Sequence, residues 1–130
     1  MNEKRNLFEK SLNLFTLNRV DRDIYSWNGK NVGWGRVFGG QVMAQTLIAA
    51  YKTIDVDHYA HSFHSYFLRP GDMDKPIIFT VDRIRNGKSF TTRNVKALQD
   101  GEAIFSCSIS FQKDEEGLEH EISIPDVPAP

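Results

Sequence analysis

Two turn dipeptides, Asn86-Gly87 and Asp100-Gly101, constrain the fold more than any other feature of this sequence. Asn-Gly and Asp-Gly favour two-residue hairpin turns, because both central positions of such a turn need a positive φ. The stretches around them alternate polar and apolar residues, which is the pattern of half-buried strands. The strands are expected over Ile77–Arg85, Lys88–Gln99 and Glu102–Gln112. This part of the chain is therefore predicted to form a three-stranded antiparallel meander.

The register of this meander follows if both loops are two-residue turns. Val81 then lies opposite Thr92, and Thr92 lies opposite Ile109. The residues predicted for the apolar face are Ile77, Phe79, Val81, Phe90, Leu98, Ala103, Phe105, Cys107, Ile109 and Phe111. Those predicted for the polar face are Thr80, Asp82, Thr91, Arg93, Ser106, Ser108 and Ser110. Three polar residues also fall on the apolar face, namely Arg83, Asn94 and Lys96. Their position there indicates a β-bulge or a subunit interface.

The segment Gly40–Lys52 is predicted to be a buried helix, because it contains no proline and is apolar around most of its circumference. Its small residues allow a curved sheet to approach the helix axis. A glycine-rich loop precedes this helix, and a strand over Tyr59–Leu68 follows it and ends in a Pro-Gly-Asp turn. Upstream, a short helix is expected over Asn2–Phe15 and a strand within Leu17–Trp27. The predicted fold class is α+β, with five or six antiparallel strands curved around one long central helix.

Length and charge limit the classes of partner. The 130 residues suffice for one domain, expected over residues 1–112, and residues 113–130 read as a charged and proline-rich tail or linker. A net charge of −1 offers no basic surface for nucleic acid, and no apolar run is long enough to cross a membrane. The polar N-terminus does not resemble a secretion signal. Neither nucleic acid nor a membrane is expected as a partner, and a cytoplasmic location is predicted.

Three motifs occur in order along the chain, and their sequences are VFGGQV at 37–42, HSFHSYFLRPGD at 61–72, and GEAIF at 101–105 with SFQ at 110–112. Together they closely resemble the N-terminal repeat of the acyl-CoA thioesterase II family. The resemblance implies a hotdog fold and a parent enzyme with two such repeats in one polypeptide. It also implies hydrolysis of fatty acyl-CoA to free fatty acid and CoA without a metal or organic cofactor, so that CoA takes part only as a portion of the substrate.

The resemblance further implies that the acting acid, hydroxyl and glutamine belong to the C-terminal repeat of the parent. The expected partners are therefore the fatty acyl-CoA substrate and either that repeat or a second copy of this chain in a homodimer. Taken alone, the chain is either a weakly active thioesterase or a non-catalytic module for acyl-CoA binding or dimerisation.

Gly39, Gly40 and Gln41 are the first candidates for substrate binding, because they stand where the buried helix begins. Backbone N–H groups at a helix start can bind an oxyanion or another anionic group. The alternative is that the glycines only permit a tight turn into the helix. The Gln41 amide can hold a water or a thioester carbonyl, but it has no basicity to act as a general base.

Basic residues near the loop ends are candidates for contact with the phosphates of CoA, or they serve solubility alone. Arg69 is the substrate-binding candidate among them, since it lies in the second motif. The others are Lys75, Arg83, Arg85 and Lys88.

His61 and His64 are candidate general bases because imidazole titrates near neutrality. Packed strand histidines are the alternative. With either histidine as the base, a third possible activity is dehydration of a 3-hydroxyacyl thioester. A metal site is not expected, because on an extended strand His58 and His64 lie about 20 Å apart and His61 points to the opposite face.

The remaining possible nucleophiles, a cysteine and several serines, are not expected to be catalytic. Cys107 alternates with apolar residues and is predicted to be a buried, inert thiol. The serines lie at strand spacing without a Gly-x-Ser-x-Gly elbow, which argues against a serine hydrolase. Direct attack by water on the thioester is the simpler route.

Overall fold

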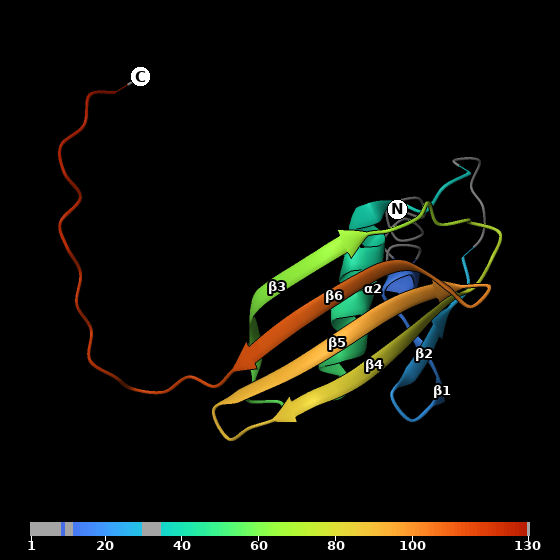
Figure 1. The fold of residues 1–130 in the computed structure, drawn as a ribbon, viewed down its shortest axis with the longest axis horizontal. Helices are drawn as coiled ribbons and strands as arrows, with labels where there is room; N and C mark the ends of the chain where they lie inside the picture. The colour runs from blue at the N-terminus through green and yellow to red at the C-terminus, as the bar shows by residue number, and fades with distance from the viewer. Residues whose placement is uncertain (1–8, 10–11, 30–34, 130) are drawn as a thin grey trace.

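The computed structural model describes residues 9, 12–29 and 35–129. Its elements, in chain order, are β1 Asn18–Asp21, β2 Ile24–Trp27, α2 Gly39–Tyr51, β3 Tyr59–Phe67, β4 Ile77–Asn86, β5 Phe90–Gln99 and β6 Glu102–Gln112. The strands form one antiparallel sheet in the order β1-β2-β4-β5-β6-β3. Figure 1 shows the sheet curving around α2. The predicted α+β architecture with one central helix is confirmed.

Helix α2 begins and ends one residue earlier than predicted. Its alanines make the close packing possible, because Ala49 and Ala50 are fully buried beneath the sheet. The hydroxyl of Thr46, also fully buried, donates to the Val42 carbonyl at 2.7 Å and so needs no other partner. The helix therefore forms one side of the core. On the sheet side the fully buried large side chains include Ile77, Phe79, Phe105, Ile109 and Phe111.

The segment predicted as a single strand within Leu17–Trp27 is a hairpin of two short strands, so this prediction is wrong. The chain reverses at Arg22 and Asp23, and Asp23 adopts a φ of 59°. Aspartate tolerates this left-handed conformation better than most residues. Of the helix predicted over Asn2–Phe15, residues 9 and 12–14 are helical, and the other residues up to 11 lie outside the described part of the chain.

The β5–β6 turn matches the prediction, whereas the β4–β5 loop does not. Asp100 and Gly101 have φ values of 51° and 80°, as a two-residue hairpin turn with two positive φ angles requires. The β4–β5 loop instead contains the three residues 87–89. Bulges between Asp82 and Arg85 and between Ala97 and Leu98 shift the register further.

The predicted pairs are therefore wrong. Val81 lies opposite Val95, and Ile109 lies opposite Arg93. A shift by one residue moves every side chain of a strand to the other face. In β5 the side chains predicted outside, Thr91 and Arg93, are buried, and Phe90, predicted inside, is exposed.

The bulge between Ala97 and Leu98 explains why the predicted register placed polar residues of β5 on the apolar face. Asn94 and Lys96 leave the apolar face, and Val95 and Ala97 take their places in the core. The apolar faces predicted for β4 and β6 are confirmed at Ile77, Phe79, Val81, Phe105, Cys107, Ile109 and Phe111.

Arg93 is buried with an exposure of only 1%. Its five N–H groups reach five neutral oxygens: Thr53 Oγ1 at 2.8 Å, the Thr53, Arg85 and Thr92 carbonyls at 2.9 Å each, and Asn86 Oδ1 at 2.6 Å. Burial lowers the pKa of the guanidinium from its ordinary value. The group lies just past the last residue of α2, where the helix dipole favours a positive charge. Arg93 thus joins the end of α2 to the β4–β5 hairpin.

Asp23 and Arg83 join the β1–β2 hairpin to β4 through two hydrogen bonds of 2.8 and 2.9 Å. These bonds hold the pKa of Asp23 below its ordinary value. A carboxyl whose pKa is lowered on folding stabilises the fold above its unfolded value of about 3.9, and this stabilisation is lost as the pH falls through the folded value. Replacing Asp23 by Asn should therefore cost up to about 1 kcal/mol at pH 7 and almost nothing at pH 2.

Urea unfolding of both proteins across this pH range measures the effect. Asp82→Asn is the matched control, because Asp82 is exposed on β4 outside this ion pair. A difference between Asp23→Asn and the unmodified protein that stays constant down to pH 2 would contradict the prediction.

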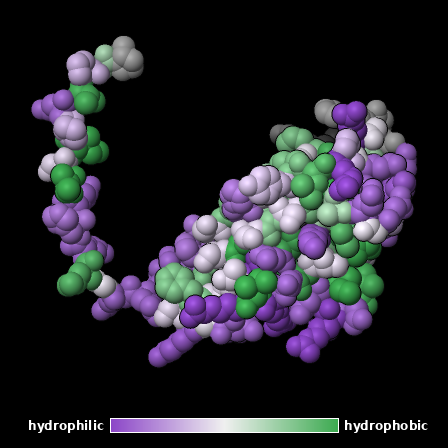
Figure 2. Space-filling model, in the orientation of Figure 1, coloured by the Kyte–Doolittle hydropathy of each residue, from purple (hydrophilic) through white to green (hydrophobic). Residues whose placement is uncertain are grey.

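The tail after β6 has no regular secondary structure over residues 113–129. Figures 1 and 2 show it running away from the domain, with green apolar residues among purple ones. The exposed apolar side chains of the tail are Leu118, Ile122, Ile124 and Val127. None of the helices that the structure describes has the length and hydrophobicity of a transmembrane segment.

Candidate functional site

The start of α2, which is the positive end of the helix dipole, has no capping side chain. Phe38 is the N-cap residue and supplies no side-chain cap, and the turn holds no acidic residue. The backbone N–H groups of Gln41 and Val42 donate to the Phe38 carbonyl at 3.1 and 3.3 Å. The amides of Gly39 and Gly40 come first in the helix and have no intrahelical acceptor. These amides can donate to an anionic or strongly polarised oxygen.

Two aromatic rings lie against the glycines of this turn. A β-carbon on Gly39 would lie 2.9 Å from Cε1 of Phe67, and one on Gly40 would lie 2.6 Å from Cε1 of Phe38. Both rings are largely exposed. The glycines therefore leave room for the Phe67 and Phe38 rings beside the helix start.

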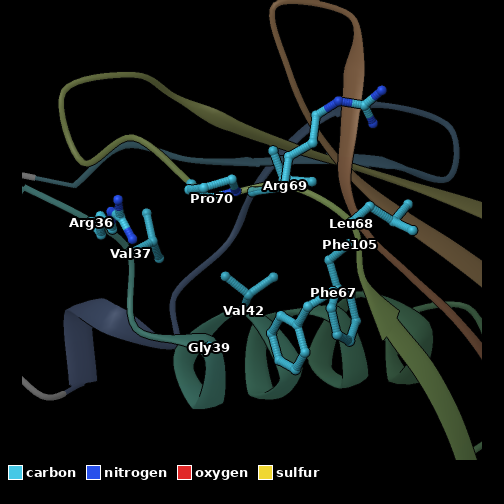
Figure 3. Close-up of a pocket in the computed structure, with 11 residues that line it drawn as sticks. Arg36, Val37, Gly39, Val42, Phe67, Leu68, Arg69, Pro70 and Phe105 are labelled. Carbon is cyan, nitrogen blue, oxygen red and sulfur yellow. The ribbon is translucent and has the colours of Figure 1, made fainter.

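A pocket of about 360 Å³, called here the arginine pocket, opens on one side of the helix start. Its lining residues are Arg36, Val37, Gly39, Val42, Phe67, Leu68, Arg69, Pro70, Gly71, Ile104 and Phe105. Figure 3 shows Val42 and Phe67 near the start of the helix, Arg36 beside Val37, and the Arg69 side chain extending away from Val42 and Phe67. The pocket thus combines an apolar floor with two cationic side chains.

A second cavity of about 690 Å³, called here the apolar groove, lies on the other flank of the helix start. Its lining residues are Gly40, Met43, Ala44, Leu47, Ala60, His61, Ser62 and Phe63. The groove runs between α2 and β3, and among the described strands β3 pairs only with β6. The backbone of β3 therefore presents one open sheet edge beside an apolar surface.

His61 lies far along β3 from the helix start. The Ala60 N–H donates to the Tyr51 hydroxyl at the end of α2, whereas the Phe67 ring lies over Gly39 at its beginning. Six residues of strand separate His61 from Phe67, or about 20 Å. The structure does not bring His61 together with Gly39 and Gly40, although His61 borders the far end of the groove.

The two candidate histidines share the outer face of the sheet, which differs from the sequence interpretation. A bulge between Ala60 and Ser62 turns His61 outward, where its Nε2 lies 2.8 Å from Ser110 Oγ. His64 pairs with Ser108, two residues from Ser110 on the same face of β6. Its ring packs edge-on against Tyr66 at 5.1 Å between centroids. Both imidazoles thus have neighbours typical of packed strand histidines.

Arg69, the substrate-binding candidate among the basic residues, is one of the lining residues of the arginine pocket. Its Nη1 donates to the Ala103 carbonyl at 2.8 Å, and its Nε lies 3.5 Å from a Glu102 carboxylate oxygen. Lys75 and Arg83 are instead bound to Asp100 and Asp23, outside this pocket.

Sequence reasoning missed Arg36 as a lining residue of the same pocket. Its position three residues before the first helix glycine was the only signal that could have indicated it.

The matches to known proteins decide the family. Residues 29–112 match the model of the acyl-CoA thioesterase N-terminal domain. The chain belongs to this family. Acyl-coenzyme A thioesterase 8 of Mus musculus is 44% identical over 119 residues, which are 90% of this chain and 37% of the mouse protein. Acyl-CoA thioesterase 2 of Haemophilus influenzae is 41% identical over 92% of this chain and 42% of its own length.

Solved structures confirm the hotdog fold of this thioesterase domain. Acyl-CoA thioesterase II TesB2 from Mycobacterium marinum superposes with a TM-score of 0.74 and 39% identity, over 92% of this chain and 44% of its own. The E. coli PaaI protein, at 15% identity and a TM-score of 0.63, shares the fold over 94% of its length. The chain spans less than half the length of the thioesterases named here, as expected for one of two repeats.

Cys107 of the thioesterase domain is buried at 4% exposure. Burial raises the pKa of its thiol to about 11. Because the thiolate is the reactive form, this cysteine is inert at neutral pH, in agreement with the prediction.

One group of possible metal ligands occurs among the described residues, at Asp55, Asp57 and His58. The carboxylate of Asp57 already lies 2.5 Å from Lys113 Nζ and 2.8 Å from His58 Nδ1. Hydrogen bonding from Lys113 lowers the pKa of Asp57. Asp57 and His58 of this cluster thus have protein partners, and the ion pair of Asp57 with Lys113 joins the start of the tail to the segment before β3.

Proposed function

We propose that this chain is the N-terminal half of an enzyme that hydrolyses fatty acyl-CoA to free fatty acid and CoA. The observation that supports the proposal best is the open helix start of α2, which lies between an arginine-lined pocket and an apolar groove. A thioester carbonyl at Gly39 and Gly40 would receive backbone N–H donors as its oxygen becomes negative. One such donor contributes about 10²- to 10³-fold to the rate of an acyl transfer.

The lining that the structure describes offers no general base for a thioester at the helix start in either cavity, because His61, the imidazole in the groove lining, lies about 20 Å along β3 from Phe67, whose ring lies over Gly39. Neither the arginine pocket nor the apolar groove has an Asp or Glu among its described lining residues. Water must lose a proton as it attacks the thioester, and an amide such as Gln41 cannot accept it. We therefore propose that the C-terminal repeat supplies the acid, the hydroxyl and the glutamine, and that no metal or organic cofactor takes part. A cytoplasmic location suits this chemistry and the composition.

A non-catalytic module for acyl-CoA binding is the second candidate for the chain taken alone, and the lack of a carboxylate in both cavities favours it. A dehydratase is less well supported, because His61 and His64 lie away from the helix start.

Hydrolysis of palmitoyl-CoA, followed by thiol release, tests the proposal. The chain alone is expected to work near the background rate, whereas the chain continued by its C-terminal repeat should be at least about 100-fold faster, the size of a lost general base. Equal rates for both proteins would mean that this half carries a catalytic set of its own. No hydrolysis by either would refute the proposal.

The open β3 edge leads to a separate prediction about assembly. The Tyr59–Phe67 strand and the apolar groove beside it would be covered by a partner repeat in the parent, and by a second copy when the chain is alone. Size-exclusion chromatography with light scattering should therefore give a homodimer at micromolar concentration. Ser62→Pro, which disturbs the edge, should shift the equilibrium towards monomer, while Ser123→Pro in the tail should not. A stable monomer of the unmodified chain would contradict the prediction.

A further inference from the structure

We infer that residues 118–127 of the tail, called here the strap, pack as a stiff, extended segment on an apolar surface of the C-terminal repeat. The inference rests on the proposed function, because it needs the two-repeat protein, and it adds an interaction segment to that protein. It follows from three features of the tail, which are a fixed root, a backbone that favours extension, and apolar side chains that this domain leaves exposed.

The root of the tail, residues 113–115, is bound to the domain. The Lys113 N–H donates to the Ser89 carbonyl at 3.1 Å, and the Lys113 ammonium lies against the Asp57 carboxylate. The Ser89 hydroxyl donates to a Glu115 carboxylate oxygen at 2.7 Å. These contacts join the tail to the β4–β5 loop and to the segment before β3. The place from which the strap departs is therefore fixed.

The root also lies beside the open edge strand of the sheet. Gln112, the last residue of β6, pairs with Tyr59, the first residue of β3. Figure 1 shows the tail leaving the domain at this corner. The β3 edge is where we propose that the partner repeat pairs, and an extended strap reaches about 30 Å. The strap therefore starts next to the C-terminal repeat and is long enough to run along it.

The backbone of the strap favours an extended conformation. Ile122, Ile124 and Val127 are β-branched, which favours extended backbone. Ile124 and Val127 each precede a proline, and a residue in this position is driven away from the helical region. Flexible linkers are rich in glycine and serine, whereas the strap contains no glycine and one serine. It therefore loses little conformational entropy when it packs on a surface.

The apolar side chains of the strap alternate with acidic ones. Successive side chains of an extended segment point to opposite sides, so Leu118, Ile122 and Ile124 share one side, and Glu119 and Glu121 lie on the other. Ile122 and Ile124 are 80 and 84% exposed in this domain. Exposed apolar side chains in a row, with a polar opposite side, mark a protein interaction site. The surface that receives the strap is therefore apolar, and the glutamates stay in water.

Urea unfolding of the two-repeat protein tests the strap. The double variant Ile122→Ser/Ile124→Ser should lower the unfolding midpoint by at least about 0.5 M, because both replacements remove buried apolar surface. In the 130-residue chain the same double variant should leave the midpoint unchanged, because this domain exposes both side chains. Glu119→Ser/Glu121→Ser in the two-repeat protein is the matched control, because it changes the opposite side of the same segment. It should leave the midpoint unchanged.

Cleavage by a glutamate-specific protease gives a second measurement, because Glu119 and Glu121 lie within the strap. A protease cuts a packed segment only when that segment leaves the surface that holds it. Mass spectrometry should show these sites cut at least about tenfold more slowly in the two-repeat protein than in the 130-residue chain. The Ile122→Ser/Ile124→Ser variant should remove this protection.

Each of three results would overturn the inference. The first is an unchanged midpoint in the two-repeat isoleucine variant, or an equal fall in the glutamate control. The second is equal cleavage of the strap in the two unmodified proteins. The third is an equal fall of the midpoint in the 130-residue chain, which would mean that the strap packs on its own domain or on a second copy. If the double variant does not fold, Ile122→Ser and Ile124→Ser are compared singly.

The proposed function and this inference can fail separately. If the two-repeat protein hydrolyses palmitoyl-CoA and the isoleucine replacements leave its midpoint unchanged, the packing of the strap is wrong and the function stands. If the midpoint falls as expected but the two-repeat protein does not hydrolyse the substrate, the function is wrong and the packing of the strap stands.

Discussion

Replacing Arg93 by methionine is expected to lower the free energy of unfolding by about 3 kcal/mol or more. Methionine has a similar length but no N–H groups, so it leaves the Thr53, Arg85 and Thr92 carbonyls and Asn86 Oδ1 without their present donor. Each buried acceptor that stays unpaired costs about 1 to 3 kcal/mol, and partial access of water reduces the sum. The variant should unfold at a clearly lower urea concentration than the unmodified protein.

Arg85→Met is the matched control for this experiment. Arg85 lies on the neighbouring strand, exposes its side chain, and contributes only its carbonyl to the network. Its replacement should change the stability by less than about 0.5 kcal/mol. If Arg93→Met is as stable as Arg85→Met, the five hydrogen bonds do not hold the helix end to the hairpin. Arg93→Lys should be intermediate, because a lysine cannot reach five acceptors.

The second large effect is expected at the helix start. In the two-repeat protein, Gly39→Val should reduce kcat/KM for palmitoyl-CoA by about 100-fold, because the new side chain meets the Phe67 ring and covers the first amides of α2. The same replacement slightly favours the helix itself, since glycine is the poorer helix former. The overlap falls on the far end of the Phe67 ring, which is largely exposed and can move aside, so the loss of activity should be much larger than any loss of stability. Gly40→Val, next to Phe38, should behave alike.

Gly117→Val makes the same chemical change in the exposed tail, where a β-carbon meets nothing within 4 Å. It should leave kcat/KM unchanged. Full activity in both helix variants would mean that the amides of this half do not contact the thioester. A parallel drop in activity and in the unfolding midpoint would mean that the glycines serve the turn alone.

The fold could be predicted from local chemistry wherever one residue type decides the backbone. Asp100 and Gly101 form the expected turn because positive φ is inexpensive at these residues. The pattern of small residues predicted the buried helix to within one residue at each end. The register predicted for β5 was wrong because a β-bulge inserts one extra residue into a strand, and amino-acid composition alone does not show where this happens. The sequence indicated the bulge only indirectly, because a register without a bulge placed the polar residues Asn94 and Lys96 in the core.

The candidate site likewise has features that the local sequence predicts and features that it does not. The helix start could be predicted because its glycines and its place after a loop are local features. That Arg36 and Arg69 line the same pocket could not be predicted, because a loop and a strand end that are distant in the sequence meet only in the folded chain. The separation of His61 from the helix start depends likewise on β3 running antiparallel to α2. Contacts between distant segments, rather than residue types, carry this information.

The open β3 edge and the bare apolar groove have a consequence for biosynthesis. If the chain is the first half of a two-repeat protein, the ribosome delivers this half before the repeat that covers it. At about 5 to 20 residues per second, a second domain of similar size follows on the order of ten seconds later. During that interval a folded domain exposes a nine-residue strand edge beside an uncovered helix flank. Nascent chains on neighbouring ribosomes could then pair through these edges, so faithful production depends on how quickly the second repeat reaches the first.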